Sequence, residues 1–175
     1  MKKKIAVVAV NPVNGFGLFQ YLETFFENQI PYRTFAVAET ADIRTNSGIP
    51  LQLDGTISDL KGHEKEYRAL VFACGDAMPS FMKEAEKPYN QTLLAVIRAF
   101  DEQKKILAGH CAAALLFEAA EAGVGKRMAV HPYARKFLQK GTAADEKTAI
   151  DGYLYTAETE HALALLLPEI VNVLK

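Results

Sequence analysis

The amino-acid sequence predicts an α/β fold, a three-layer α/β/α sandwich in which helices cover both faces of a mainly parallel sheet. Two observations predict it. Several short runs are continuously apolar and rich in β-branched residues, as in strands that are buried on both faces. Between them lie longer segments whose apolar residues recur at helical spacing. Buried strands that alternate with helices form βαβ units, and these build a parallel sheet.

The length and charge of the chain limit its class. At 175 residues we expect one domain, residues 1–175, which is long enough to bury a core without a metal or a disulfide. A net charge of −1 gives no indication of a nucleic acid or a membrane surface as partner. Two cysteines cannot build a disulfide framework, so we expect a cytoplasmic protein. The apolar run behind the N-terminal lysines is shorter than the ~20 residues of a membrane span and lacks a signal-peptide cleavage pattern.

The N-terminal part of the chain predicts a buried strand and an aromatic helix. Residues 4–10, KIAVVAV, read as a strand covered on both faces. The residues NPVNG end it, and residues 16–30 then predict a helix, followed by a second strand at 32–38. The helix carries aromatic residues at helical spacing, which we interpret as core packing and not as a cofactor site. This stripe consists of Phe16, Phe19, Phe25 and Phe26.

The rest of the chain repeats the alternation of strands and helices. Residues 39–68 are less regular and hold a strand-like piece around 51–53. The later elements are, in order, a strand at 69–75, a helix at 90–103, a strand at 104–109, a helix at 112–123 that Gly123 ends, strand pieces near 128–130 and 152–155, and a helix at 160–175 that Pro168 interrupts.

Ligands of such sheets bind beyond the carboxyl ends of the strands. Residues 11–15, residues 75–78 and Cys111 all follow a predicted strand directly, so we expect the functional site among them. Cys111 stands between a strand and a helix, where a tight turn exposes the side chain and the free N–H groups of the helix favour an anion. Its neighbours Gly109, Ala112 and Ala113 are small enough for that turn. A small buried core cysteine fits the same pattern, and the residues alone leave both interpretations open.

Three segments of the chain resemble the ThiJ/PfpI superfamily. They are LVFACGDAMP, KKILAGHCAAALLFEAAEAGVGKRMAVHP and DGYLYTAETEHALALLLPEIVNVL, and together they extend the resemblance over nearly the whole chain. The resemblance implies the flavodoxin-like fold of class I glutamine amidotransferases. It also implies a relation to bacterial "protease I" proteins, deglycases, isocyanide hydratases and chaperones.

The resemblance assigns roles to several residues. It implies that Cys111 is the reactive residue and that His131 assists it. The loop after the third strand, Gly75 and Asp76, would lend a backbone N–H to an oxyanion together with the N–H of Ala112. Relatives of this kind are commonly dimers or larger homo-oligomers. No tightly bound cofactor and no metal are implied.

The chain also departs from the family pattern. Asn14 stands where the family usually has a carboxylate, and an amide can donate a hydrogen bond to a thiolate but cannot take its proton. The protease-like members carry a histidine directly after the cysteine, whereas this chain has Ala112 there and His110 before the cysteine. The residues ETEHA replace the usual R-G-P-G before the last helix. These departures weaken the prediction that the chain is a peptidase with a Cys-His pair.

Other candidate residues have two interpretations each. His110 is a second base or a residue that merely ends a strand. Cys74 is a core residue or the partner that would resolve an oxidised Cys111 as a disulfide. Asp76 either caps its loop or orients His131 or a water. A cluster of metal-ligating residue types near the end of the chain is interpreted as a helix start with acids in its first turn. It consists of Glu158, Glu160 and His161.

Two classes of function follow from these residues. The first is a cysteine-dependent hydrolase, hydratase or deglycase-like enzyme that acts on a small carbonyl compound, another electrophile or a peptide. The second is a redox sensor or stress chaperone in which Cys111 becomes oxidised to a sulfinic acid. A third interpretation is a protein that has kept the fold and lost the chemistry.

Overall fold

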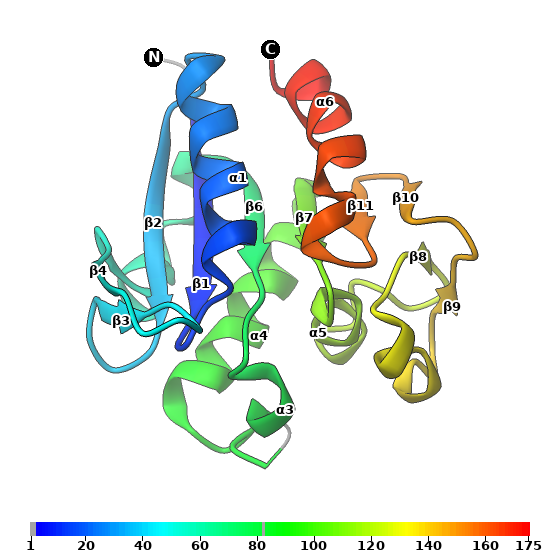
Figure 1. Cartoon of the computed structure of the whole chain (residues 1–175), viewed down its shortest axis with the longest axis horizontal. Helices are drawn as coiled ribbons and strands as arrows, with labels where there is room; N and C mark the ends of the chain where they lie inside the picture. Colours follow the sequence, from blue (N-terminus) through cyan, green and yellow to red (C-terminus); the bar gives the residue numbers. More distant parts are fainter. Residues whose placement is uncertain (1–2, 82) are drawn as a thin grey trace.

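The computed structural model describes residues 3–81 and 83–175, and its centre is a seven-stranded sheet (Figure 1). The strand order is β10-β11-β7-β6-β1-β2-β5. All neighbours pair in parallel except β10, which is antiparallel to β11. The strands are β1 (Lys4–Val10), β2 (Tyr32–Val37), β5 (Gly55–Thr56), β6 (Tyr67–Ala73), β7 (Ile106–His110), β10 (Thr148–Asp151) and β11 (Leu154–Ala157). The structure thus confirms the mainly parallel sheet.

Helices cover both faces of the sheet, as the sequence predicts. Helices α1 (Gly15–Glu27) and α6 (Leu163–Leu174) lie beside each other on one face, and α4 (Pro88–Glu102) and α5 (Ala113–Ala119) lie on the other (Figure 1). Strand β1 shows why its sequence is apolar throughout. Residues 6, 8 and 10 enter the core under α4 and α5, while residues 5, 7 and 9 enter the core under α1 and α6.

Shorter elements surround this sandwich. A hairpin of β3 (Asp42–Arg44) and β4 (Pro50–Gln52) and a parallel pair of β8 (Arg127–Met128) and β9 (Thr142–Ala143) form two small sheets. The short helices are α2 (Ile57–Leu60), α3 (Met78–Phe81) and the 3₁₀ helices η1 (Glu64–Glu66), η2 (Pro132–Phe137) and η3 (Glu160–Ala162). Within the described residues, no helix has the length and apolar character that crossing a membrane requires.

Only Phe25 of the aromatic stripe of α1 packs in the core, which corrects the sequence-based interpretation for its other three members. Phe25 is buried, but Phe16, Phe19 and Phe26 are 57 %, 42 % and 73 % exposed. At 3.6 residues per turn, the buried face of the helix runs through Leu18, Tyr21 and Phe25, and the other three phenylalanines fall on the opposite side.

Two predictions about where helices stop also differ from the structure: the end of α5 at Gly123 and the interruption of α6 at Pro168. Helix α5 ends at Ala119, and Glu121 rather than Gly123 takes the left-handed conformation, with φ 69°. Gly123 is needed for close packing, because an added Cβ would lie 2.7 Å from the Cε atom of Met128. Helix α6 continues through Pro168, which lies on its exposed side.

Candidate functional site

Cys111 lies at a sharp turn between β7 and α5. It follows His110, the last residue of the strand, and its backbone is left-handed, with φ 61°. Its N–H donates to the carbonyl of Ala157 at the end of β11, at 3.1 Å. Gly109 has no room for a side chain, because an added Cβ would lie 2.5 Å from the Cβ of Ala113. The structure therefore confirms the tight strand-to-helix turn that the small residues predict.

Neutral hydrogen-bond donors hold the half-buried sulfur of Cys111. The thiol of Cys74 donates a hydrogen bond to it, and this is the main reason why the pKa of Cys111 lies below its ordinary value. Burial acts against this shift of the pKa, and the N–H of Ala112, at the start of α5, lowers it further. A thiol with a lowered pKa and partial access to solvent has the properties of a nucleophile.

Cys74 is the buried member of this pair. It follows β6, and its side chain is only 1 % exposed. The hydrogen bond with Cys111 and the burial of its sulfur raise the pKa of Cys74 well above the ordinary value. The N–H groups of Ala112 and Gly75 also donate to this sulfur, which lowers the pKa in part. Cys74 therefore keeps its proton under conditions in which Cys111 loses one.

The loop after β6 packs closely against the loop after β1. A Cβ at Gly75 would lie 2.2 Å from the carbonyl oxygen of Pro12, so only glycine fits there. The N–H of Asp76 donates to Oδ1 of Asn46 at 3.1 Å. Because that N–H is already engaged, Asp76 is not placed as an oxyanion donor in this structure. The N–H groups of Gly75 and Ala112 lie beside the cysteine sulfurs, and their role as oxyanion donors stays a prediction.

Asn14 uses its amide for other contacts than Cys111. Its Oδ1 accepts the N–H of Gly17 at 2.6 Å and so caps the start of α1. Its Nδ2 donates to Oε1 of Glu160 at 3.3 Å. The capping bond fixes the orientation of the amide, so its N–H groups face Glu160.

Glu160 belongs to the site, although the sequence suggested only a helix start. It lies in η3, three residues beyond the end of β11, and its side chain is 24 % exposed. Its negative charge raises the pKa of Cys111 and that of His110. A signal for it exists in the sequence, because Glu160 closely follows the strand that neighbours the strand of Cys111.

His131 is tied to Cys111 through the backbone. Its N–H donates to the carbonyl of Cys111 at 3.0 Å, which places the imidazole at the same edge of the sheet. Nδ1 accepts the N–H of Tyr133 at 3.2 Å, and the two rings stack with centroids 5.5 Å apart. A neutral imidazole that accepts at Nδ1 carries its proton on Nε2. His131 is therefore arranged to donate a hydrogen bond from Nε2.

His110 is a buried core residue that ends its strand, and this favours the structural interpretation over that of a second base. It is 1 % exposed, and its Nδ1 lies 3.1 Å from the hydroxyl of Tyr21. Burial lowers its pKa to about 4, against a smaller opposite effect of Glu160. Its Nε2 faces Gly17, where an added Cβ would lie 2.6 Å away. The ring is thus on the α1 side of the sheet, whereas Cys111 packs on the α5 side.

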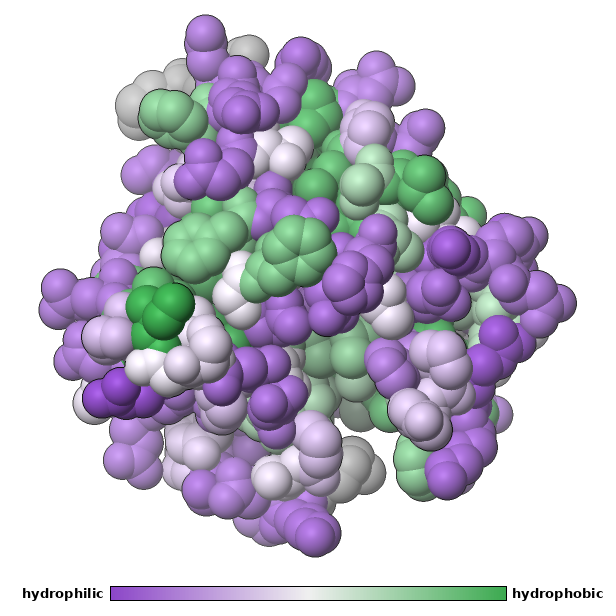
Figure 2. Space-filling view, viewed as in Figure 1, coloured by the Kyte–Doolittle hydropathy of each residue, from purple (hydrophilic) through white to green (hydrophobic). Residues whose placement is uncertain are grey.

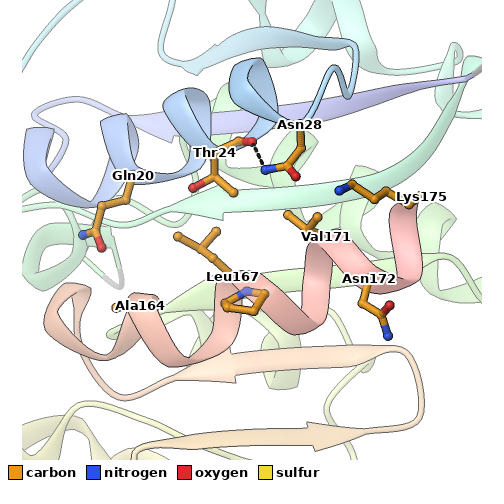
Figure 3. A pocket seen from close by; sticks show the side chains of 9 residues that line it. Gln20, Thr24, Asn28, Ala164, Leu167, Val171, Asn172 and Lys175 are labelled. Carbon is orange, nitrogen blue, oxygen red and sulfur yellow. Dashed lines mark hydrogen bonds between the residues drawn. The ribbon is translucent and has the colours of Figure 1, made fainter.

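Other possible sites are few in the described part of the chain. No three metal-ligating side chains come together among residues 3–81 and 83–175. Oε1 of Glu160 lies 3.8 Å from Nε2 of His161 in η3, at the start of the last helical segment. An open groove of about 620 Å³ runs between α1 and α6 (Figure 3). Its lining includes Gln20, Leu167 and Lys175 but not Cys111.

A family model, a protein sequence and two solved structures resemble this chain. The model of the DJ-1/PfpI family matches residues 3–173. Protein ppBat of Bacteroides thetaiotaomicron is 53 % identical over 175 residues, 100 % of both chains. A solved structure from the same organism, with the provisional name protease I, is 53 % identical, covers 99 % of each chain and has a TM-score of 0.97. A DJ-1 superfamily protein of Salmonella typhimurium, solved as a cysteine-to-alanine mutant, shares the fold at 21 % identity, with 98 % and 90 % of the two chains covered and a TM-score of 0.85.

Proposed function

The chain belongs to the DJ-1/PfpI family, and from that premise we propose that it is an enzyme with Cys111 as its nucleophile. Its reaction is of the hydrolase, hydratase or deglycase type. Its substrate is a small carbonyl compound or a similar electrophile. The observation that carries this proposal is the left-handed turn at Cys111, at which neutral donors stabilise the thiolate of a partly accessible cysteine.

The backbone around the sulfur suits the chemistry of an attack on a carbonyl carbon. The thiolate of Cys111 adds to that carbon, and the carbonyl oxygen becomes an oxyanion. The N–H groups of Ala112 and Gly75 are the donors nearest to the sulfurs and can hold this oxyanion. The Nε2–H of His131 can donate a further hydrogen bond to this oxyanion, and the proton that completes the addition comes from water. Asn14 acts indirectly, by holding Glu160.

A peptide is the alternative substrate, because a 53 % identical protein carries the name protease I. The residue after the nucleophile is Ala112, so this chain lacks the adjacent histidine with which protease-like members pair their cysteine. His131 is the imidazole that remains at this edge, and its Nδ1 is engaged by Tyr133. A hydrolytic reaction on peptides would therefore lack a histidine positioned as a base for Cys111.

The rate of Cys111 alkylation as a function of pH tests the proposal first. We expect iodoacetamide to modify Cys111 with a midpoint below the ~8.5 of a free thiol, measured by peptide mass in the wild-type protein. Carbonyl compounds and unstructured peptides are then screened for turnover, with Cys111→Ser as the inactive control. A midpoint at or above that of a free thiol, together with no turnover, would show that the fold has been kept without the chemistry.

A further inference from the structure

The two cysteines of the chain are opposite each other on neighbouring strands. Strands β6 and β7 pair in parallel, with Val71 opposite Ala108 and Phe72 opposite Gly109. The same register continued by two residues places Cys74 opposite Cys111. Neighbouring strands lie about 4.8 Å apart, and the Cα atoms of disulfide-bonded cysteines lie roughly 4.4–6.8 Å apart. The backbone positions therefore suit a disulfide.

The side chains meet as well. Cys74 belongs to the core under α4 and α5, and Cys111 packs against that same core. The two thiols are near enough for each to shift the pKa of the other, and the N–H of Ala112 acts on the pKa of both. Because both residues follow the last residue of their strand, the formation of a bond between them does not require a change in the ladder of the sheet.

The two thiols differ in access, and this difference sets the order of events. Cys111 is partly exposed, so an oxidant in solution can reach it. Cys74 is 1 % exposed and lies under the turn that carries Cys111. The chain contains two cysteines in all, so Cys111 is the one thiol of the same chain with which Cys74 can form a disulfide.

We propose that Cys74 and Cys111 form a redox-active dithiol, which hydroperoxides oxidise to an intramolecular disulfide. The Cys111 thiolate attacks one oxygen of the hydroperoxide, the O–O bond breaks, and the alcohol or water leaves with a proton. Cys111 is then a sulfenic acid. Cys74 gives up its proton and attacks the Cys111 sulfur; the S–S bond forms, the S–O bond breaks and water leaves. Two thiols and one hydroperoxide thus give one disulfide, one alcohol or water, and one further water.

The disulfide has two consequences for the site. It consumes the sulfenic acid before a second oxidant can convert it to sulfinic acid, which ordinary thiols cannot reduce. It also ties up the Cys111 sulfur until two molecules of a small thiol reduce the bond. The inference needs a reactive Cys111 but no turnover, so it stands apart from the proposed enzymatic reaction.

Mass spectrometry of the oxidised protein tests the proposal. Reduced wild-type protein receives one equivalent of hydrogen peroxide and is then denatured in iodoacetamide. We expect a loss of about 2 Da and no alkylation, and the tryptic peptides 69–83 and 106–126 joined in a non-reducing digest. Dithiothreitol should restore two alkylatable thiols.

Matched variants separate this outcome from its alternatives. In Cys74→Ala and Cys74→Ser treated with at least two equivalents of peroxide, we expect Cys111 to gain about 32 Da, the mass of two oxygens, because no resolving thiol is present. Wild-type protein receives the same excess as a matched sample. The proposal is wrong if wild-type Cys111 gains this mass while Cys74 remains alkylatable, or if the disulfide joins two copies of the chain on a non-reducing gel. The alkylation profile of Cys111 shows separately whether the nucleophile itself is reactive.

Discussion

At the scale of single residues, the surroundings of Cys111 combine neutral donors with negative charges. The thiol of Cys74 and the N–H of Ala112 stabilise the thiolate, whereas the carboxylates of Glu160 and Asp76 oppose it by raising the pKa of Cys111. The negative potential that these carboxylates create repels anions. Neutral electrophiles and hydroperoxides therefore suit this site better than substrates that carry a carboxylate or a phosphate.

The charge of Glu160 can be tested without disturbing its hydrogen bond. Glu160→Gln keeps an oxygen that accepts from the Asn14 amide but removes the negative charge. Since the carboxylate raises the pKa of Cys111, its neutralisation should shift the midpoint of Cys111 alkylation to lower pH. Glu158→Gln is the matched control, with the same chemical change two residues away. A midpoint that does not move, or that moves upward, would remove Glu160 from the site.

At the scale of elements, what the sequence predicts depends on how local the signal is. The strand β1 and the helix α1 could be predicted because KIAVVAV and the repeat of apolar residues are local patterns. The buried face of α1 could not, because both of its sides carry large apolar residues and the choice is made by distant partners. One such partner is His110, which contacts Tyr21 across 89 residues of sequence.

The candidate site shows the same division. The turn at Cys111 was predictable because small residues around a cysteine between a strand and a helix form a local pattern. The hydrogen bond between Asn14 and Glu160 was not predictable, because the two residues lie 146 positions apart in the chain. For the same reason, the occupation of the Asp76 N–H by Asn46 could not be anticipated from either segment alone.

One buried carboxylate joins α5 to the loop that leads into β9. Glu118 is 8 % exposed and accepts the N–H groups of Gln139, Lys140 and Gly141. Burial acts to raise its pKa, but these three donors outweigh it, and the pKa of Glu118 lies below the ordinary value. The contact holds the chain beyond η2 against the helix that begins beside Cys111.

We therefore expect Glu118→Gln to destabilise the protein by about 1–3 kcal/mol, as for the loss of hydrogen bonds to a buried charged group. Because the native pKa is lowered, this stability is present above about pH 4.3, the pKa of an unperturbed glutamate. It disappears as the pH falls through the native pKa. Urea unfolding of both proteins at several pH values measures this. An equal difference at pH 7 and at pH 3 would contradict the assigned ionisation.

At the scale of the whole molecule, apolar side chains gather on the face that carries α1 and α6 (Figure 2). Phe16, Phe19 and Phe26 of α1 and Leu165 of α6 are exposed, on the two helices that flank the groove. We propose that a second copy of the chain covers this face, in line with the dimer or larger homo-oligomer that the family resemblance implies. Because Asn14 caps the N-terminus of α1, such an interface would border the site of Cys111.

A charged substitution on this face tests the dimer. Burial of a phenylalanine side chain is worth roughly 1.5–3 kcal/mol, and in a two-fold interface every substitution acts twice. Phe19→Glu should therefore weaken dimerisation by at least about tenfold and leave the thermal unfolding of the monomer nearly unchanged, since Phe19 is already 42 % exposed. Phe137→Glu, at an exposed phenylalanine of η2, is the control that should keep the dimer. Sedimentation equilibrium measures both variants, and a wild-type chain that is monomeric at high concentration would refute the interface.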